Sequence, residues 1–224
     1  MRKISMILRK FVVFCFFLYL TVAAIAAPVQ TQTADDELVQ LLNNIHTMQA
    51  TFKQFMVNDA GAPVGQKTSG QMALVRPGKF RWEAIQPSKQ LIIVNDNKVM
   101  IYDVDLEQVI KRKVDYKKPG NPAMLLSGST ETLKQMFKIT KLKKSGDGIW
   151  FKLTPKKNNQ TKQNSDYQWV KMCFISGQLS AMYILDNLGQ QSEIHFTSVE
   201  INSKISQDKF IFVAPPKVDV LDEG

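Results

Sequence analysis

The chain has 224 residues, 44% of them hydrophobic, and its 29 Lys and Arg residues against 20 Asp and Glu give a formal net charge of +9. This length suits one domain with a core of its own, so we expect a single domain. The basic balance favours anionic lipid head groups or acidic partner surfaces. Of the two cysteines, Cys15 lies near the N-terminus, inside the leader described next. Removal of the leader leaves only Cys173, so no internal disulfide is possible in the remaining chain.

Residues 1–26 have the features of a secretory signal peptide. A basic start precedes an apolar run and an A-x-A cleavage site: Arg2, Lys3, Arg9 and Lys10, then Phe11 to Ile25, then Ala24-Ile25-Ala26. We expect cleavage after Ala26 or Ala27, which leaves a secreted, soluble domain over 27–224 with a charge of about +5. Cys15 falls inside the leader and lacks the small neighbours of a lipid-modified cysteine, so no membrane tether is expected. Secretion also argues against nucleic acid as a partner.

A helix is predicted at the start of the secreted domain. Thr33 and Asp36 have the spacing of a capping box, and the acidic first turn suits the helix dipole. Apolar residues then recur with helical spacing over about four turns, namely Leu38, Leu41, Leu42, Ile45 and Met48. The periodicity alone favours a helix that packs permanently over a sheet.

Short strands separated by polar turns are predicted over most of the remaining chain. Before the middle they are expected from Ala50 onward, Lys67 to Leu74, Lys79 to Ile85, Gln90 to Val94, Val99 to Val104 and Gln108 to Val114. After it they are expected at Ile139 to Lys144, Gly148 to Thr154, Tyr167 to Phe174, Gln178 to Asp186, Gln190 to Ile201 and Phe210 to Val213. Because the connections are too short for crossover helices, the sheet should be antiparallel.

The middle of the chain interrupts this pattern with two short helical segments. Ala123 to Leu126 lies between turn formers, and Thr130 starts a second turn that runs through Phe137. Several strands are apolar on both faces, which requires something to cover each face. These features predict a β-rich α+β fold, an incomplete antiparallel barrel of about 11 strands with helices in its mouth. The tail after Pro216 looks loosely ordered.

Catalysis is not expected. The secreted domain contains only His46 and His195, and a structural or solvent-facing role is expected for each. Cys173 has no recognisable nucleophilic partner and is expected to be a small packed hydrophobe. Asp96, Asp103 and Asp105 lack the spacing of a calcium loop, so neither a metal site nor a cofactor is predicted.

A tight turn and the strand after it are the most informative local feature. In Val75 to Trp82, Pro77 and Gly78 reverse the chain directly after Arg76. Phe80 and Trp82 then alternate with Lys79 and Arg81. With the preceding helix, Phe52-Lys53-Gln54-Phe55, Gln86-Pro87, Val94-Asn95-Asp96, Tyr102-Asp103 and Pro122 to Leu126, this ordered series resembles the periplasmic outer-membrane lipoprotein carrier family, LolA.

The resemblance implies an α-helical lid over an apolar cavity, with the first helix as part of the lid, and a carrier rather than an enzyme. It implies a monomeric protein that takes acylated lipoproteins from an inner-membrane lipoprotein-releasing ABC transporter (LolCDE) and delivers them to an outer-membrane receptor (LolB), with only transient membrane proximity. It also implies that Arg76 holds the lid shut through carbonyl groups around Leu125, Leu126 and Ser127. The implied acyl-chain cavity is lined by Leu38, Leu41, Leu42, Ile45, Phe52, Phe55, Phe80, Trp82, Ile92, Met100, Met124, Met182 and Ile184.

Other interpretations stay open at this point. A filled core would use the same apolar residues as a cavity. An outer-membrane lipoprotein receptor of the same fold, a periplasmic lipid hydrolase, and a structural protein on an anionic membrane are the alternative functions. Pro77-Gly78-Lys79, Val114 to Lys118 and Ala123 depart from the family pattern. Basic residues that could meet the transporter or receptor are Lys111, Arg112, Lys113, Lys117 and Lys118, although a solvated charged strand is the default.

Overall fold

A computed structural model describes residues 32–113, 122–143, 146–156 and 165–223. The predicted leader, Cys15 and the basic residues Lys117 and Lys118 lie outside the described residues, so the signal peptide and the domain start stay predictions. Gln32 onward forms one compact unit.

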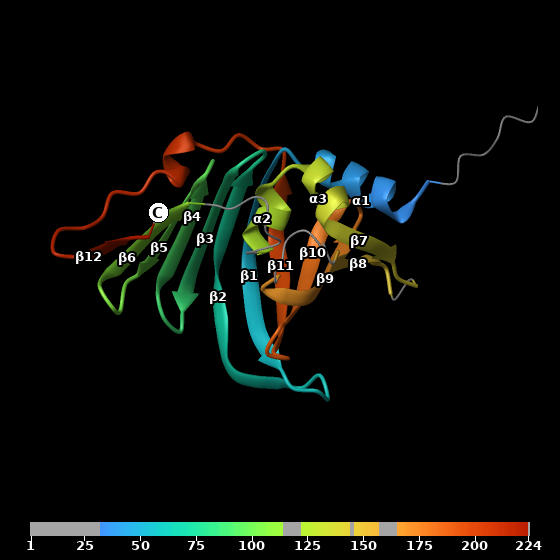
Figure 1. The fold of residues 1–224 in the computed structure, drawn as a ribbon, viewed down its shortest axis with the longest axis horizontal. Coiled ribbons are helices and arrows are strands. Elements are labelled where there is room, and N and C mark those ends of the chain that lie inside the picture. The colour runs from blue at the N-terminus through green and yellow to red at the C-terminus, as the bar shows by residue number, and fades with distance from the viewer. Residues whose placement is uncertain (1–31, 114–121, 144–145, 157–164, 224) are drawn as a thin grey trace, which may run out of the picture. The chain divides into compact units, whose positions relative to one another are not determined.

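Twelve strands in the described part of the chain form one sheet, in the order β12-β6-β5-β4-β3-β2-β1-β11-β10-β9-β8-β7. The first six are β1 Thr47–Val57, β2 Pro63–Val75, β3 Lys79–Gln86, β4 Gln90–Asn95, β5 Lys98–Asp103 and β6 Gln108–Lys113. The others are β7 Phe137–Lys141, β8 Ile149–Pro155, β9 Tyr167–Ile175, β10 Gln178–Asp186, β11 Gln191–Ile201 and β12 Asp219–Asp222. The open, curved sheet confirms the incomplete barrel (Figure 1).

Three α-helices and one 3-10 helix accompany the sheet in the described residues: α1 Ala34–Asn43, α2 Pro122–Ser127, α3 Thr130–Met136 and η1 Gln207–Phe210. Helix α2 contacts β2 and β3, whereas α1 and α3 contact each other and β7. The lid formed by α1, α2 and α3 therefore reaches from the edge strand β7 to the middle of the sheet (Figure 1).

Helix α1 begins where its capping residues predict. The Thr33 hydroxyl accepts a hydrogen bond from the Asp36 N–H at 3.2 Å, and Asp35, Asp36 and Glu37 fill the first turn. The helix ends at Asn43, shorter than the four turns predicted. Met48 belongs instead to β1, where it pairs with Leu74, so backbone pairing in the sheet overrides the helical spacing of this segment.

One main core lies between the sheet and the lid. The inner face is the sheet face that the lid covers, and it includes the rows Met48–Leu74–Phe80–Val94 and Ala50–Met72–Trp82–Ile92 across neighbouring strands. Leu38 and Leu42 of α1 and Leu125 and Leu126 of α2 join this core. The apolar lid face is thus buried against the apolar sheet face.

The C-terminal segment corrects two expectations. Phe210 to Val213 is not a strand, because Gln207–Phe210 forms the 3-10 helix and Phe210 packs with Ala73 and Ile205 in a second small core on the outer face, the sheet face turned away from the lid. The tail is not loose either. Strand β12 pairs in parallel with β6 and forms the edge of the sheet opposite β7.

Candidate functional site

The Arg76 guanidinium joins three separate parts of the lid. Nη1 donates to the carbonyl of Leu42 at 2.8 Å, and Nη2 donates to the carbonyls of Gly128 at 3.0 Å and Leu125 at 3.5 Å. Leu42 lies in the last turn of α1, Leu125 in α2, and Gly128 in the link from α2 to α3. A fork of rigid N–H donors is suited to holding several carbonyls at once.

Backbone hydrogen bonds of the same turn reinforce this connection. The Arg76 N–H donates to His46 O and the Gly78 N–H donates to Ser127 O, both at 2.8 Å. Gly78 has φ +87°, a conformation that favours glycine. The turn after β2 therefore bonds both the segment between α1 and β1 and the last residue of α2.

Arg76 is largely withdrawn from water. Burial lowers the pKa of Arg76 to about 10, so the guanidinium is still a cation at neutral pH. Its acceptors in the lid are main-chain carbonyls, which carry no full charge, and such charge-assisted bonds contribute ~1.5–3 kcal/mol each. Three neutral acceptors hold the lid without the cost of burying a carboxylate partner.

A surface hollow of about 410 Å³ opens beside Arg76. It is lined by Leu42, Asn43, Ile45, His46, Arg76, Pro77, Gly128, Ser129, Thr130 and Glu131. Across it, the Thr130 hydroxyl donates to the side-chain oxygen of Asn43 at 3.0 Å, which links the start of α3 to the end of α1. The hollow therefore lies next to the hydrogen bonds of Arg76 to Leu42 and Gly128.

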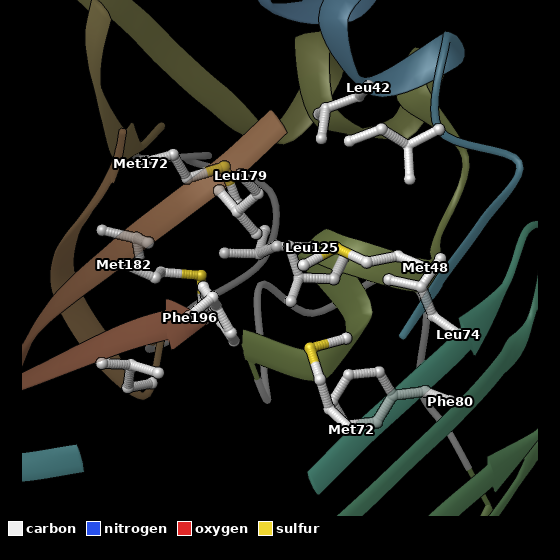
Figure 2. Close-up of a cluster of buried hydrophobic side chains, with 14 of the residues drawn as sticks. Leu42, Met48, Met72, Leu74, Phe80, Leu125, Met172, Leu179, Met182 and Phe196 are labelled. Atoms are coloured by element: carbon white, nitrogen blue, oxygen red, sulfur yellow. The ribbon is translucent and has the colours of Figure 1, made fainter. Parts of the chain in front are cut away.

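The space under the lid is apolar and rich in methionine. Met48, Met72, Met172 and Met182 are each at most 3% exposed and belong to one core with the aromatic residues of the sheet. Figure 2 shows Leu125 of α2 between Met182 and Phe196 on one side and Met48 and Leu74 on the other. Unbranched thioether side chains adapt to irregular guests, so this interior can repack around flexible chains.

Most of the predicted lining residues meet in this core. Leu38, Leu42, Ile45, Phe52, Phe80 and Met182 are buried there, and Leu41, Trp82, Ile92 and Ile184 pack against it partly buried. Phe52 stacks on Trp82 with ring centroids 3.5 Å apart. Met124 lies in α2, but its side chain is outside the described residues.

Two of the predicted lining residues face the other way. Phe55 stacks on His195 on the outer face, and Met100 pairs with Ile93, which pairs with Arg81 in an outer-face row. Side chains alternate along a strand, so Phe55 cannot share the face of Phe52, nor Met100 that of Ile101. Both residues are removed from the cavity lining.

The predicted latch is also placed differently in detail. Leu125 O accepts from Arg76, but Ser127 O accepts from Gly78 N–H, and the 2.8 Å and 3.0 Å partners of Arg76 are Leu42 and Gly128. Leu126 contributes its side chain to the core.

A further residue that fixes the lid escaped the sequence analysis. The Asn202 side-chain amide accepts from His46 N–H and donates to Asn44 O, which fixes the turn between α1 and β1. Asn202 follows the end of β11 and has a positive φ of 59°. Nothing in the local sequence indicates that its partner, Asn44, lies 158 residues away.

Cys173 and His195, the side chains considered for catalysis, do not belong to the core between the sheet and the lid. The Cys173 side chain is buried, and burial raises the pKa of its thiol, which weakens it as a nucleophile. His195 lies on the outer face, 3.6 Å from Glu193. Within the described residues, no cluster of three or more His, Cys, Asp or Glu side chains is placed to hold a metal ion.

None of the described helices has the length and apolar character that crossing a membrane requires.

Comparison with known proteins agrees with this architecture. Residues 43–213 match the family model described as outer membrane lipoprotein carrier protein LolA. The chain is 37% identical over 209 residues to an outer-membrane lipoprotein carrier protein of Pseudomonas paraeruginosa, covering 91% of this chain and 97% of that protein. It is 36% identical over 190 residues to one of Coxiella burnetii, covering 85% and 87%.

A solved structure supports the fold. An uncharacterized conserved protein from Thermus thermophilus superposes with a TM-score of 0.51 at 10% identity, covering 84% of this chain and 99% of that one. At that identity the likeness concerns the fold alone. Because the family model spans most of the folded unit and the curated relatives align over nearly their whole length, the chain belongs to the LolA family of outer-membrane lipoprotein carrier proteins.

Proposed function

We propose that this protein is a periplasmic carrier, without enzymatic activity or a cofactor, that shields the acyl chains of lipoproteins between its sheet and its lid. It takes them from an inner-membrane lipoprotein-releasing ABC transporter (LolCDE) and delivers them to an outer-membrane receptor (LolB), acting as a soluble, monomeric domain after removal of its leader. One observation carries the proposal: the Arg76 guanidinium bonds carbonyls of α1 and of the link after α2 beside a methionine-rich apolar core.

The energetics favour a cavity that opens for its ligand. Each CH₂ moved from water into an apolar interior contributes ~0.8 kcal/mol, so three acyl chains supply tens of kcal/mol. The Arg76 bonds, at ~1.5–3 kcal/mol each, are far weaker. Acyl chains can therefore displace the lid, while the bonds that re-form on closure favour release.

The surroundings of Cys173 weigh against a lipid hydrolase, since a buried thiol of raised pKa is a poor nucleophile. A membrane-tethered receptor of the same fold would need a lipid-attachment cysteine, and Cys173 is buried in β9.

The test is release of lipoprotein from membranes. Inner-membrane vesicles that hold a triacylated lipoprotein and the transporter are incubated with the protein and ATP. A soluble one-to-one complex is expected in the supernatant, and lipoprotein that stays in vesicles with an active transporter would contradict the carrier role.

The latch is tested with two arginine variants. Arg76→Leu is expected to accept lipoprotein but to transfer it poorly to receptor-containing outer membranes, because closure no longer drives the ligand out. Arg81→Leu is the matched control, since Arg81 bonds Glu83 and the Lys209 carbonyl on the outer face. Normal transfer by Arg76→Leu, or an equal loss in both variants, would remove the latch role.

A further inference from the structure

The outer face of β8, β9, β10, β11 and β1 carries aromatic and basic side chains in adjacent rows. One row runs Lys152–Lys171–Tyr183–Glu193–Phe55 across the five strands. The next runs Trp150–Cys173–Ala181–His195–Lys53. We call this surface, together with Trp169, the lysine–tryptophan face.

Its aromatic side chains form one connected series. Phe55 stacks on His195 at 5.4 Å, His195 lies 5.8 Å from Tyr183, and Tyr183 lies 4.8 Å from Trp150, all between ring centroids. Phe55, Trp150, Trp169, Tyr183 and His195 are all partly exposed. A broad amphipathic aromatic surface open to solvent is typical of a contact site.

Two lysines on this face are placed against each other. Lys152 and Lys171 are direct partners across β8 and β9, and both ammonium groups lie over the Trp169 ring, at 5.6 Å and 4.4 Å from its centroid. Partial burial and the neighbouring Lys152 lower the pKa of Lys171. Like charges directly opposite each other are unfavourable, and an anion between them relieves the repulsion.

The charge of the face is positive overall. Lys53 lies in the second row, and Lys138 pairs with Thr154 on the same side of the sheet. Glu193 is the carboxylate within the rows, and it is engaged beside His195 and Tyr183. Within the two rows, three lysines against this one carboxylate complement an anionic surface.

The residue types distinguish a lipid surface from a protein partner. Lysine is depleted in protein–protein interfaces. Tryptophan and tyrosine with lysine stems are the residues that settle at the boundary of a bilayer, the rings at head-group level and the ammonium groups toward phosphate.

From these features we propose that the lysine–tryptophan face binds the surface of an anionic phospholipid bilayer. The contact leaves the lid free, because the face lies on the opposite side of the sheet. It does not depend on the carrier role proposed above.

The experiment measures binding of the secreted form to protein-free vesicles, with or without phosphatidylglycerol in phosphatidylcholine. Binding to the anionic vesicles is expected, with weakening at high salt. Each basic residue near an anionic surface contributes about fivefold in affinity, so Lys152→Gln with Lys171→Gln should weaken binding about 25-fold. Lys111→Gln with Lys113→Gln on β6 is the control of equal charge and should bind nearly as the parent does.

The chain has three tryptophans, which report the orientation. In a Trp82→Phe variant the remaining Trp150 and Trp169 should be quenched by brominated anionic lipid. In a Trp150→Phe, Trp169→Phe variant, Trp82 on the inner face should not be quenched. The proposal is overturned by absence of vesicle binding, by equal losses in the two lysine pairs as expected for charge alone or an acidic protein partner, or by quenching of Trp82 alone.

Discussion

The carbonyl oxygen of Leu42 in the last turn of α1 lies 2.8 Å from Nη1 of Arg76, the residue that follows β2. The same carbonyl accepts the Ile45 N–H at 3.1 Å where α1 ends, so its two lone pairs serve the helix end and the guanidinium together. Arg76 thus joins the end of β2 to the end of α1.

Replacement of Arg76 should loosen both α1 and α2. Amide hydrogen exchange in the two helices is expected to speed up in Arg76→Leu, and less so in Arg76→Lys, because one ammonium group cannot reach Leu42 and Gly128 as a planar fork does. Exchange in β8 and β9 serves as the internal reference. If α1 exchanges as slowly in Arg76→Leu as in the parent, Arg76 does not hold it.

Acid and salt should weaken the other end of α1. Lys134 of α3 lies 2.5 Å from the Asp36 carboxylate, and their hydrogen bond lowers the pKa of Asp36 below its ordinary value. A carboxylate whose pKa is lowered by folding stabilises the folded state at pH values above its pKa in the unfolded chain. That contribution is lost as the pH falls through its pKa in the folded state. The protection of α1 amides, measured against their intrinsic exchange rate at each pH, should therefore fall as the pH drops below about 4, by less than about fivefold, because exposed pairs are weak.

Lys134→Ala provides the comparison for this effect. It should raise exchange in α1 at neutral pH and abolish most of the salt dependence there. An α1 whose exchange responds to salt equally in parent and variant would assign the effect to other charges, such as the Lys141–Glu37 pair.

Gly70→Ala should destabilise the fold. Gly70 pairs with Phe52, and a Cβ at this position would collide with the backbone carbonyl of Glu83 and lie 2.9 Å from the Phe52 ring. Overpacking of this kind costs ~1–3 kcal/mol, which lowers Tm by ~2–4 °C per kcal/mol in a protein of this size. Thermal unfolding checks the change, with Gln71→Ala, at an exposed neighbour, expected to stay near the parent Tm.

Phe210→Ala should open a cavity in the outer core. The Phe210 side chain is 1% exposed against Ala73 and Ile205, and truncation of a buried Phe costs ~3–5 kcal/mol. Ile211, 59% exposed, is the adjacent control, and Ile211→Ala should have little effect. Urea unfolding that gives similar midpoints for the two variants would mean that the C-terminal segment does not pack stably on the sheet.

Local sequence signals predicted most of the strands and their antiparallel order. The polar turns at Gln86-Pro87 and Asn95 to Lys98 separate β3, β4 and β5 where expected, because short turns between apolar runs permit only hairpins. What escaped prediction depends on distant partners. The end of α1 is set by pairing of β1 with β2, and the exposed strand β12 takes its register from β6.

The candidate site, too, was predicted only in part, because some of its features depend on distant parts of the chain. The family resemblance pointed to Arg76 and to carbonyls around Leu125, and Leu125 O is one of its acceptors. The acceptors Leu42 and Gly128 were not predicted, because no side-chain pattern specifies a main-chain acceptor. Phe55 and Met100 were misplaced because hydrophobicity was given more weight than the alternation of faces along a strand. The lysine–tryptophan face was not predicted, since it assembles from five strands.

The pairing of β1 with β11 has a consequence for the order of folding. The hydroxyl of Thr51 bonds the carbonyl of Thr197, 146 residues later, whereas the neighbouring hairpins on either side are local. Closing so long a loop is slow and costs entropy before contacts repay it. A chain synthesised from its N-terminus has β1 available long before β11, so its core stays incomplete until nearly all of the chain is free to fold.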